Sequence, residues 1–196
     1  MGVLRIAPLT PERWPDFVKL FGPRGACAGC WCQFPRLTSP EWKTQGTANR
    51  RAMKRIVDSG RAPGLLAYDG DQAVGWIALA PREVYRRFER SRILEPVDDR
   101  PVWSVPCFFI ARSARGRGIT VRLLKAACDY VAAQGGNIVE GYPVDPRGRH
   151  YAPTFAWHGL VAAFRAAGFK EVARRSATRP IMRRQLRAGR RAAVRG

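Results

Sequence analysis

The sequence predicts a single α/β domain of the α+β kind, in which strands and helices pack around one core. The chain has 196 residues, of which 46% are apolar, and a chain of this length buries roughly two-thirds of the surface that it exposes when unfolded. Short apolar runs bounded by turn residues predict strands, and longer runs with helical periodicity predict helices. The two kinds of run alternate without an internal repeat, in the order βα αββ βαβ αββ.

The N-terminal part predicts one strand and two helices. Apolar residues 3–9 form the strand, and Thr10 with Pro11 gives the start of a helix that continues to about Leu20. Residues 22–38 are too rich in Gly, Pro and Cys for regular structure. A second, basic helix is expected to begin at Ser39-Pro40-Glu41, is clearest from Thr47 to Val57, and ends at Ser59-Gly60.

The middle of the chain predicts a hairpin followed by an irregular strand. Residues 64–69 and 72–81 are apolar and are joined by Gly70-Asp71, which favours a tight antiparallel turn. The charged residues 82–100 are expected to form a short helix with a loop. Residues 102–112 are an apolar strand, and Pro106 in its middle predicts a bulge or a splay because proline cannot donate to a ladder.

The C-terminal part predicts two helices alternating with strands. Residues 116–133 have a helical apolar stripe that Gly135-Gly136 ends. A strand is expected at 137–144, a helix at 158–169, and a closing hairpin over 169–184. These elements form one domain over residues 1–186, and the basic residues 187–196 are expected to be a flexible tail.

The charge of the chain is strongly positive, at +20. From Arg174 onward there are nine arginines and no acid, so this end carries nearly half of the net charge. Such a charge attracts polyanions, including nucleic acid, but a solvated basic surface explains it equally. No apolar run is long enough to span a membrane, and the N-terminus lacks the apolar stretch of a signal peptide, so a cytoplasmic location without membrane contact is expected.

The most informative motif is the glycine-rich turn between the strand at 102–112 and the helix that follows. Its sequence is ARSARGRGITVRLL. A strand that leads through glycines into a helix N-terminus presents free N–H groups and the positive end of the helix dipole to an anion. Gly116 and Gly118 allow close approach because they have no Cβ. The turn lacks the Lys-Ser/Thr of a nucleoside-triphosphate loop and the third glycine of a dinucleotide fingerprint.

The segment CFFIARSARGRGITVRLLKAA resembles motif A of the GNAT superfamily of N-acetyltransferases. The text from Phe164 to Val172, FRAAGFKEV, is similar to the end of such domains, and the order of elements matches over about residues 3–184. The resemblance implies a mixed, mostly antiparallel twisted sheet flanked by helices. It also implies a splay between the strands at 102–112 and 137–144, which would admit a thioester.

The resemblance further implies acetyl-coenzyme A as co-substrate, with no metal. The pyrophosphate would be bound by main-chain amides of the turn, formed by Arg115, Gly116, Arg117, Gly118, Ile119 and Thr120. The strand at Phe109 and Ile110 would pair with the pantetheine arm, and an amide of residues 108–110 would polarise the thioester carbonyl. A homodimer is compatible with this family.

Three positions depart from the family pattern. Ser113 stands where Gln or Arg is usual, and Thr120 replaces a frequent Gly or Ala. Phe164 occupies the position at which many members have the tyrosine that protonates the leaving thiolate. The usual general acid is therefore absent.

The groups that move protons must then come from elsewhere. Glu140 lies inside the apolar run IVEGYPV and is the favoured base, or an anchor for the substrate ammonium, although it could equally pair with one of the many arginines. Tyr142 is a candidate acid, together with Tyr151, His158 and Cys107. A free thiol is a tolerable leaving group, so a mechanism without an acid is a further alternative.

The loop Cys27-Ala28-Gly29-Cys30-Trp31-Cys32 has the spacing of zinc ligands, but a structural site needs a fourth ligand from elsewhere. A zinc site and a redox pair remain as alternatives, and packed thiols are favoured. In the layout of the resembled family this loop borders the acceptor site, so Trp31 and Phe34 are expected to contact substrate unless they are ordinary core residues.

The sequence therefore favours an N-acetyltransferase that moves an acetyl group to the primary amine of a small molecule by direct attack. Two alternatives remain open. One is acetylation of a macromolecular amine, either of a protein or of an aminoacyl-tRNA, which the basic tail would favour. The other is a non-catalytic nucleic-acid-binding module on the same fold.

Overall fold

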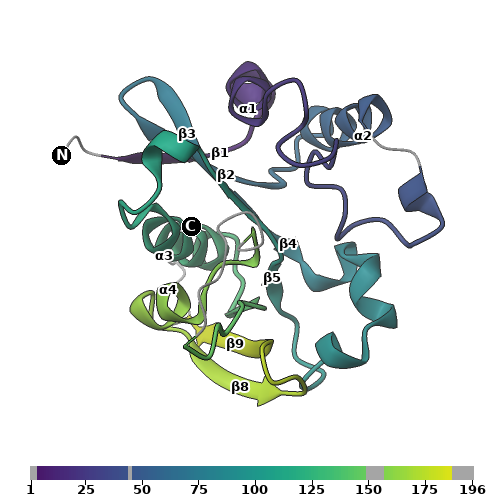
Figure 1. The fold of residues 1–196 in the computed structure, drawn as a ribbon, viewed down its shortest axis with the longest axis vertical. Coiled ribbons are helices and arrows are strands. Elements are labelled where there is room, and N and C mark those ends of the chain that lie inside the picture. The colour runs from purple at the N-terminus through teal and green to yellow at the C-terminus, as the bar shows by residue number, and fades with distance from the viewer. Residues whose placement is uncertain (1–3, 44–45, 149–156, 187–196) are drawn as a thin grey trace, which may run out of the picture.

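In the computed structural model, which describes residues 4–43, 46–148 and 157–186, two twisted sheets are surrounded by helices (Figure 1). The strands are β1 (Arg5–Pro8), β2 (Gly64–Asp69), β3 (Gln72–Ala78), β4 (Ala80–Pro81), β5 (Trp103–Val105), β6 (Phe108–Ile110), β7 (Ile138–Gly141), β8 (Lys170–Arg174) and β9 (Pro180–Gln185). The α-helices are α1 (Trp14–Phe21), α2 (Thr47–Asp58), α3 (Ile119–Ala133) and α4 (Val161–Ala166).

The first sheet has the order β1-β2-β3-β6, and all of its neighbours are antiparallel. Its centre is the predicted hairpin, in which Gly70 takes a positive φ of 58° at the turn. The second sheet has the order β4-β5-β7-β9-β8. Only β5 and β7 pair in parallel among the described strands, so the expected mixed, mostly antiparallel architecture is confirmed.

The apolar segment 102–112 is not one strand, as the sequence predicts, but two. Pro106 and Cys107 separate β5, which pairs with β7 in the second sheet, from β6, which pairs with β3 in the first. Pro106 has no N–H to continue a ladder. The last β5–β7 pair joins Val105 to Gly141, and beyond it β6 turns away from β7. The predicted splay is therefore confirmed.

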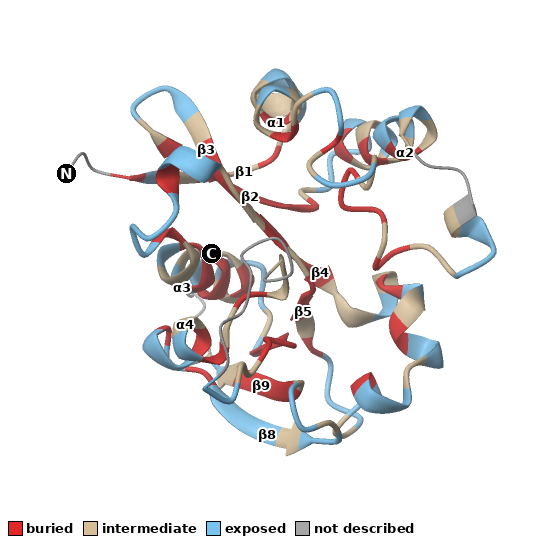
Figure 2. Ribbon diagram, in the orientation of Figure 1, coloured by how far each residue is buried: buried red, intermediate tan, exposed pale blue. Residues whose placement is uncertain are grey.

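Helices cover both faces of the first sheet, and its central strands β2 and β3 are largely buried, whereas the edge strand β8 of the second sheet is mostly exposed (Figure 2). The helices α3 and α4 pack on one side, where Leu123, Leu124 and Phe164 belong to the largest apolar cluster. The helices α1 and α2 pack on the opposite face of the first sheet, around Phe17 and Trp76. Two layers of apolar side chains thus fix the position of β6, the strand nearest the splay.

Several predicted helix boundaries are wrong. The third helix begins at Ile119 instead of Gly116, because Gly118 takes a left-handed conformation with φ 71° as its N-cap. The motif at 39–41 starts only a 3₁₀ turn at Glu41–Lys43, and α2 begins separately at Thr47. The hydroxyl of Thr10 makes no capping hydrogen bond to the first turn that follows.

The charged segment 82–100 contains three 3₁₀ turns, at Arg82–Val84, Arg86–Arg90 and Arg92–Leu94, in place of the expected short α-helix. Tyr85, Phe88 and Leu94 anchor it in a third apolar cluster with Tyr142, which directly follows β7. The apolar anchors are thus spread along irregular backbone and do not form a helical stripe.

No helix among residues 4–43, 46–148 and 157–186 is long and apolar enough to cross a bilayer. The tail predicted at 187–196 lies outside the described residues, as does Tyr151.

Candidate active site at the splay

The glycine-rich turn before α3 borders open space. Gly116 and Gly118 have positive φ values of 76° and 71°, a conformation that L side chains rarely adopt. A Cβ at either glycine would meet no atom within 4 Å, so both main-chain faces border free space. The turn therefore leaves room for a ligand group to approach the backbone of these two glycines.

The first amides of α3 have no intrahelical partners, whereas the Arg115 amide of the preceding turn donates to the Arg112 carbonyl at 3.4 Å. Among the described residues, the first helical N–H groups with a backbone acceptor are those of Val121 and Arg122. Both donate to the Gly118 carbonyl. The preceding amides of Ile119 and Thr120 lie in the first helical turn, where no intrahelical acceptor exists. Fifteen residues of α3 add their dipole to these donors. The site fits a diphosphate.

The two arginines of the turn are exposed and already have contacts. Arg117 forms an ion pair with Asp69 at 2.9 Å, and the Nε of Arg115 donates to the Ile110 carbonyl at 3.2 Å. The positive charge at the turn is therefore partly neutralised. The main-chain amides remain the principal hydrogen-bond donors for an anion. Ile119 is buried against Gly75 of β3, which fixes the start of α3 on the sheet.

The strand β6 is an edge strand of the first sheet and leads into this turn. The Ala111 amide bonds the Val74 carbonyl and the Ala78 amide bonds the Cys107 carbonyl, so odd-numbered residues of β6 bond toward β3. By antiparallel alternation the main-chain groups of Phe108 and Ile110 point the other way, into the splay, where the Ile110 carbonyl already accepts a hydrogen bond from Arg115 Nε. Ile110 thus lies in the edge strand of the first sheet, whereas Phe109 pairs with Trp76 and turns its ring to Phe21, at 5.3 Å between centroids.

Phe164 closes the base of the splay. Its ring is fully buried, lies edge-on to Phe108 at 6.0 Å, and fills the space that a side chain at Gly141 would need. A Cβ at Gly141 would stand 2.2 Å from Phe164 Cε1. The residue at the family's tyrosine position therefore serves packing in this chain.

Glu140 is the centre of a buried ion-pair cluster. Its Oε1 accepts from Arg82 Nη1 at 3.1 Å and from the Tyr142 hydroxyl at 2.6 Å, and its Oε2 accepts from Arg183 Nε at 2.6 Å. Arg183 also pairs with Asp98 at 2.8 Å. This arrangement corresponds to the arginine-paired interpretation of Glu140, and it ties the 82–100 segment to the second sheet.

Tyr142 belongs to the same cluster. Its hydroxyl lies 2.6 Å from Arg82 Nη1 and 2.8 Å from Ser104 Oγ. Burial, followed by the charge of Glu140, raises the pKa of Tyr142 well above its usual value. A phenol held in this way is a weak proton donor near neutral pH.

A pocket of about 200 Å³ opens at the residue that divides β5 from β6. Pro106 lines it together with Phe34, Arg87, Trp157 and His158. The rings of Phe34 and Trp157 meet edge-on at 5.8 Å. The cysteine loop predicts Phe34 as a lining residue, whereas no local motif in the sequence marks Arg87 or Trp157.

His158 links this pocket to the splay. Its Nδ1 lies 2.9 Å from the Pro106 carbonyl, which can only accept, so Nδ1 carries the proton and Nε2 of the neutral ring does not. Burial, reinforced by the charge of Arg179, lowers the pKa of His158 to about 3. The imidazole is therefore neutral at physiological pH, and its Nε2 lone pair accepts no hydrogen bond from the described residues.

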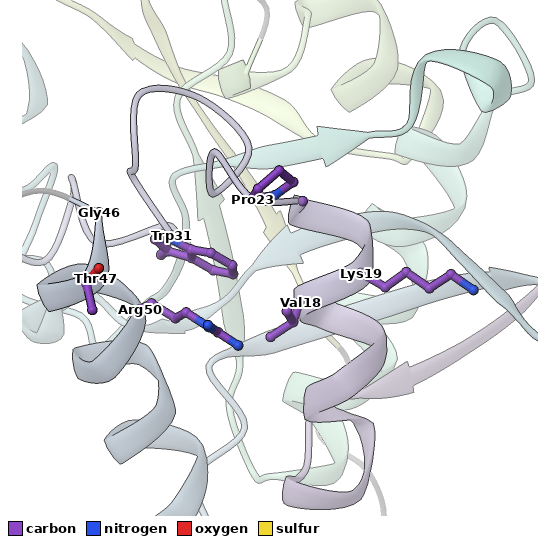
Figure 3. A pocket seen from close by; sticks show the side chains of 8 residues that line it. Val18, Lys19, Pro23, Trp31, Gly46, Thr47 and Arg50 are labelled. Carbon is purple, nitrogen blue, oxygen red and sulfur yellow. The ribbon is translucent and has the colours of Figure 1, made fainter.

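Trp31 lines a different pocket, of about 430 Å³, between α1 and α2 (Figure 3). Its ring is buried, and the guanidinium of Arg50 lies 5.5 Å from the ring centroid. Figure 3 shows Arg50 alongside Trp31, whereas Lys19 points away from them. The two aromatic residues predicted as substrate contacts thus lie at two separate pockets.

The cysteines form no metal-binding group within the described residues. Cys32 is buried and accepts a hydrogen bond from Trp76 Nε1 at 3.3 Å. Its thiol also bonds that of Cys107, which together with burial raises the pKa of Cys107 well above its usual value. Cys27, Cys30, Cys32, Cys107 and Cys128 are all free thiols.

The fold thus combines a sheet edge at β6 with a helix N-terminus that follows a glycine-rich turn. The model of the acetyltransferase (GNAT) family matches residues 29–152, so the chain belongs to that family and is an acetyltransferase. No curated protein matches the sequence.

Solved structures support the fold. An acetyltransferase of the GNAT family from Streptococcus pneumoniae superposes with a TM-score of 0.56 at 13% identity, over 94% of this chain and 99% of that chain. An N-acetyltransferase from Staphylococcus aureus Mu50 gives 0.55 at 12% identity, over 95% and 100%. The ribosomal-protein-S5-alanine acetyltransferase from Vibrio fischeri gives 0.54 at 10%, over 94% of each chain.

Proposed function

We propose that the chain transfers the acetyl group of acetyl-coenzyme A to the primary amine of a small molecule by direct attack. The observation that carries this is the open space at Gly116 and Gly118, next to first-turn amides of α3 that have no intrahelical acceptor and beside the edge strand β6. When bound, acetyl-coenzyme A supplies an activated acyl thioester. The residues of the chain supply its orientation.

Each part of the chain has a distinct task in this proposal. The amides of residues 116–120 bind the pyrophosphate, and the edge groups of Phe108 and Ile110 pair with the pantetheine arm. An outward N–H of one of these two residues donates to the thioester carbonyl and stabilises the developing oxyanion. The acceptor amine approaches from the pocket at Pro106.

The step in which the acceptor amine loses its proton is the one that the geometry constrains least. Glu140 and Tyr142 stay predictions as base and acid, and their enclosure among Arg82 and Arg183 favours a structural role. His158 lines the acceptor pocket and has a free lone pair on Nε2. We assign to His158 the role of orienting a neutral amine, from which its Nε2 would accept a hydrogen bond. A pKa of about 3 makes the imidazole too weak a base to hold the proton of the amine.

A small-molecule acceptor is favoured over a macromolecular one by the size of the pocket, which at about 200 Å³ is below the range of about 300–1,000 Å³ typical of drug-sized ligands. The test is incubation of the protein with acetyl-coenzyme A and a panel of primary amines, followed by mass spectrometry of the products. An acetylated small amine is expected. Acetylation of added peptides or aminoacyl-tRNA alone would show that the acceptor is a macromolecule. A melting temperature that acetyl-coenzyme A does not raise would reject the proposal as a whole.

A further inference from the structure

The pocket beside Pro106 has two aromatic walls that stand at right angles to each other. The rings of Phe34 and Trp157 meet edge-on, with centroids 5.8 Å apart and planes at 88°. Both residues line the pocket and are only partly buried, so their rings have surface that a ligand can cover. Phe88 and Leu94 add further apolar lining. The pocket therefore offers an apolar surface for the body of a bound molecule.

Neighbouring side chains hold the two walls in place. Trp42 lies edge-on to Phe34 with centroids 5.1 Å apart, and the guanidinium carbon of Arg87 lies 3.9 Å from the centroid of the Phe34 ring. On the other wall, the rings of Trp157 and His158 have centroids 3.4 Å apart. A pocket whose walls are fixed before binding loses little conformational entropy when a ligand enters.

The aromatic walls border the group to which we assign the orientation of the amine. His158 follows Trp157 directly in the chain and also lines the pocket, and its Nδ1 lies 2.9 Å from the Pro106 carbonyl at the splay. A molecule whose nitrogen donates to His158 Nε2 therefore places its body against Trp157 and Phe34 if only a short chain separates the two parts.

The size and geometry of the pocket suit one aromatic ring. Its volume is about 200 Å³, and an apolar cavity of roughly 150 Å³ is large enough to bind benzene. The room that remains holds a short chain and an amine. Aromatic rings prefer edge-to-face contacts, which add about two- to tenfold in affinity beyond the effect of the buried area. A ligand ring in this pocket extends the edge-to-face arrangement that Trp42, Phe34 and Trp157 already form.

We infer, on the basis of the function proposed above, that the acceptor is a primary amine joined by a short chain to a single aromatic ring, and that Phe34 and Trp157 bind this ring. The ring binds by leaving water and by edge-to-face contact with the two walls. The amine lies at the Pro106 end of the pocket, beside His158 and next to the splay. Amines with an aliphatic ring or a hydroxylated body are poorer acceptors, because they lack one or both of these contributions.

Matched acceptor amines test this preference in the wild-type enzyme. Benzylamine and cyclohexylmethylamine are both alkylamines of similar size and differ in the aromaticity of the ring, whereas ethanolamine has no ring. The kcat/KM of benzylamine is expected to exceed that of cyclohexylmethylamine by about two- to tenfold and that of ethanolamine by about tenfold or more. A kcat/KM of benzylamine that is not the highest of the three would overturn the inference. Acetylation of ethanolamine alone would do so while leaving acetyl transfer to a small amine intact.

Variants then assign the preference to the two walls. Phe34→Leu and Trp157→Leu keep an apolar side chain but remove a ring, so each should reduce the advantage of benzylamine through its KM. Trp14→Leu is the matched control, because Trp14 is a partly buried residue of α1 that packs near Phe17 and does not line the pocket. An unchanged preference in both wall variants, or an equal loss in Trp14→Leu, would contradict the assignment.

A binding measurement covers the case in which no amine of the set is acetylated or in which a wall variant fails to fold. Calorimetry on wild-type protein saturated with coenzyme A would compare N-benzylacetamide with N-(cyclohexylmethyl)acetamide, the products of the two matched amines. Tighter binding of N-benzylacetamide by about two- to tenfold supports the inference. Equal binding, weaker binding or no binding of N-benzylacetamide overturns it. If coenzyme A itself does not bind, the proposed function fails first, and the two failures are thereby distinguished.

Discussion

Replacing Glu140 with glutamine should destabilise the fold strongly. The carboxylate accepts three hydrogen bonds from Arg82, Tyr142 and Arg183, and Arg183 is only 4% exposed. The amide of the introduced glutamine would keep one acceptor oxygen but direct N–H groups at a guanidinium. Removing one partner of a buried ion pair typically costs about 3–5 kcal/mol.

For a chain of this size, 1 kcal/mol shifts the melting temperature by roughly 2–4 °C, so a decrease of about 6–20 °C is expected. Thermal and urea unfolding followed by circular dichroism measure it. Asp58→Asn is the control, because Asp58 pairs with Lys54 on the surface and its loss should change little. A melting temperature of Glu140→Gln within about 2 °C of wild type would refute the structural reasoning. A flattened pH–rate profile in the same variant would instead restore Glu140 as the base.

Two further predictions concern the base of the splay and the pocket beside it. Gly141→Ala should cost about 1–3 kcal/mol of stability in urea unfolding, because its Cβ would lie 2.2 Å from the Phe164 ring, and adding Phe164→Leu should recover part of the loss; additive effects would contradict the contact. His158 has a folded pKa of about 3, below its ordinary 6.5, so the unfolded chain takes up the proton first as the pH falls. Its contribution to stability should be complete above about pH 6.5 and be lost progressively toward pH 3. The difference in unfolding free energy between wild type and His158→Asn should therefore be constant above pH 7 and shrink below pH 6, and a difference independent of pH would contradict the neutral buried imidazole.

The features that the sequence predicts well are those with local signals. The hairpin around Gly70 and the turn at Gly116 and Gly118 depend on residues within a few positions of each other. All three glycines have the positive φ values expected at such turns. Pro106 marks the split of the strand at 102–112, because the loss of one N–H interrupts pairing wherever it occurs. The local sequence does not predict which sheet each half of this strand joins.

Contacts between distant segments explain most of what the sequence does not predict. Arg82 and Arg183 lie 58 and 43 positions from Glu140, and in a chain with 35 basic residues nothing local singles them out. The pocket joins Phe34 to Arg87, 53 positions away, and both to Trp157. Residues 82–100 form 3₁₀ turns instead of the predicted helix because tertiary packing, and not propensity, sets the positions of their anchors.

The most direct test of the account is calorimetric titration of acetyl-coenzyme A into wild-type protein, Gly118→Glu and Gly135→Glu. Both glycines have a positive φ, 71° and 79°, and both face open space, but they stand at opposite ends of α3. The backbone strain is therefore matched, and only Gly118→Glu places a carboxylate against the pyrophosphate. The account predicts wild-type affinity for Gly135→Glu and a loss of about 100-fold or more for Gly118→Glu, since like charges in contact cost several kcal/mol. Equal affinities in all three proteins would contradict binding at the mouth of α3.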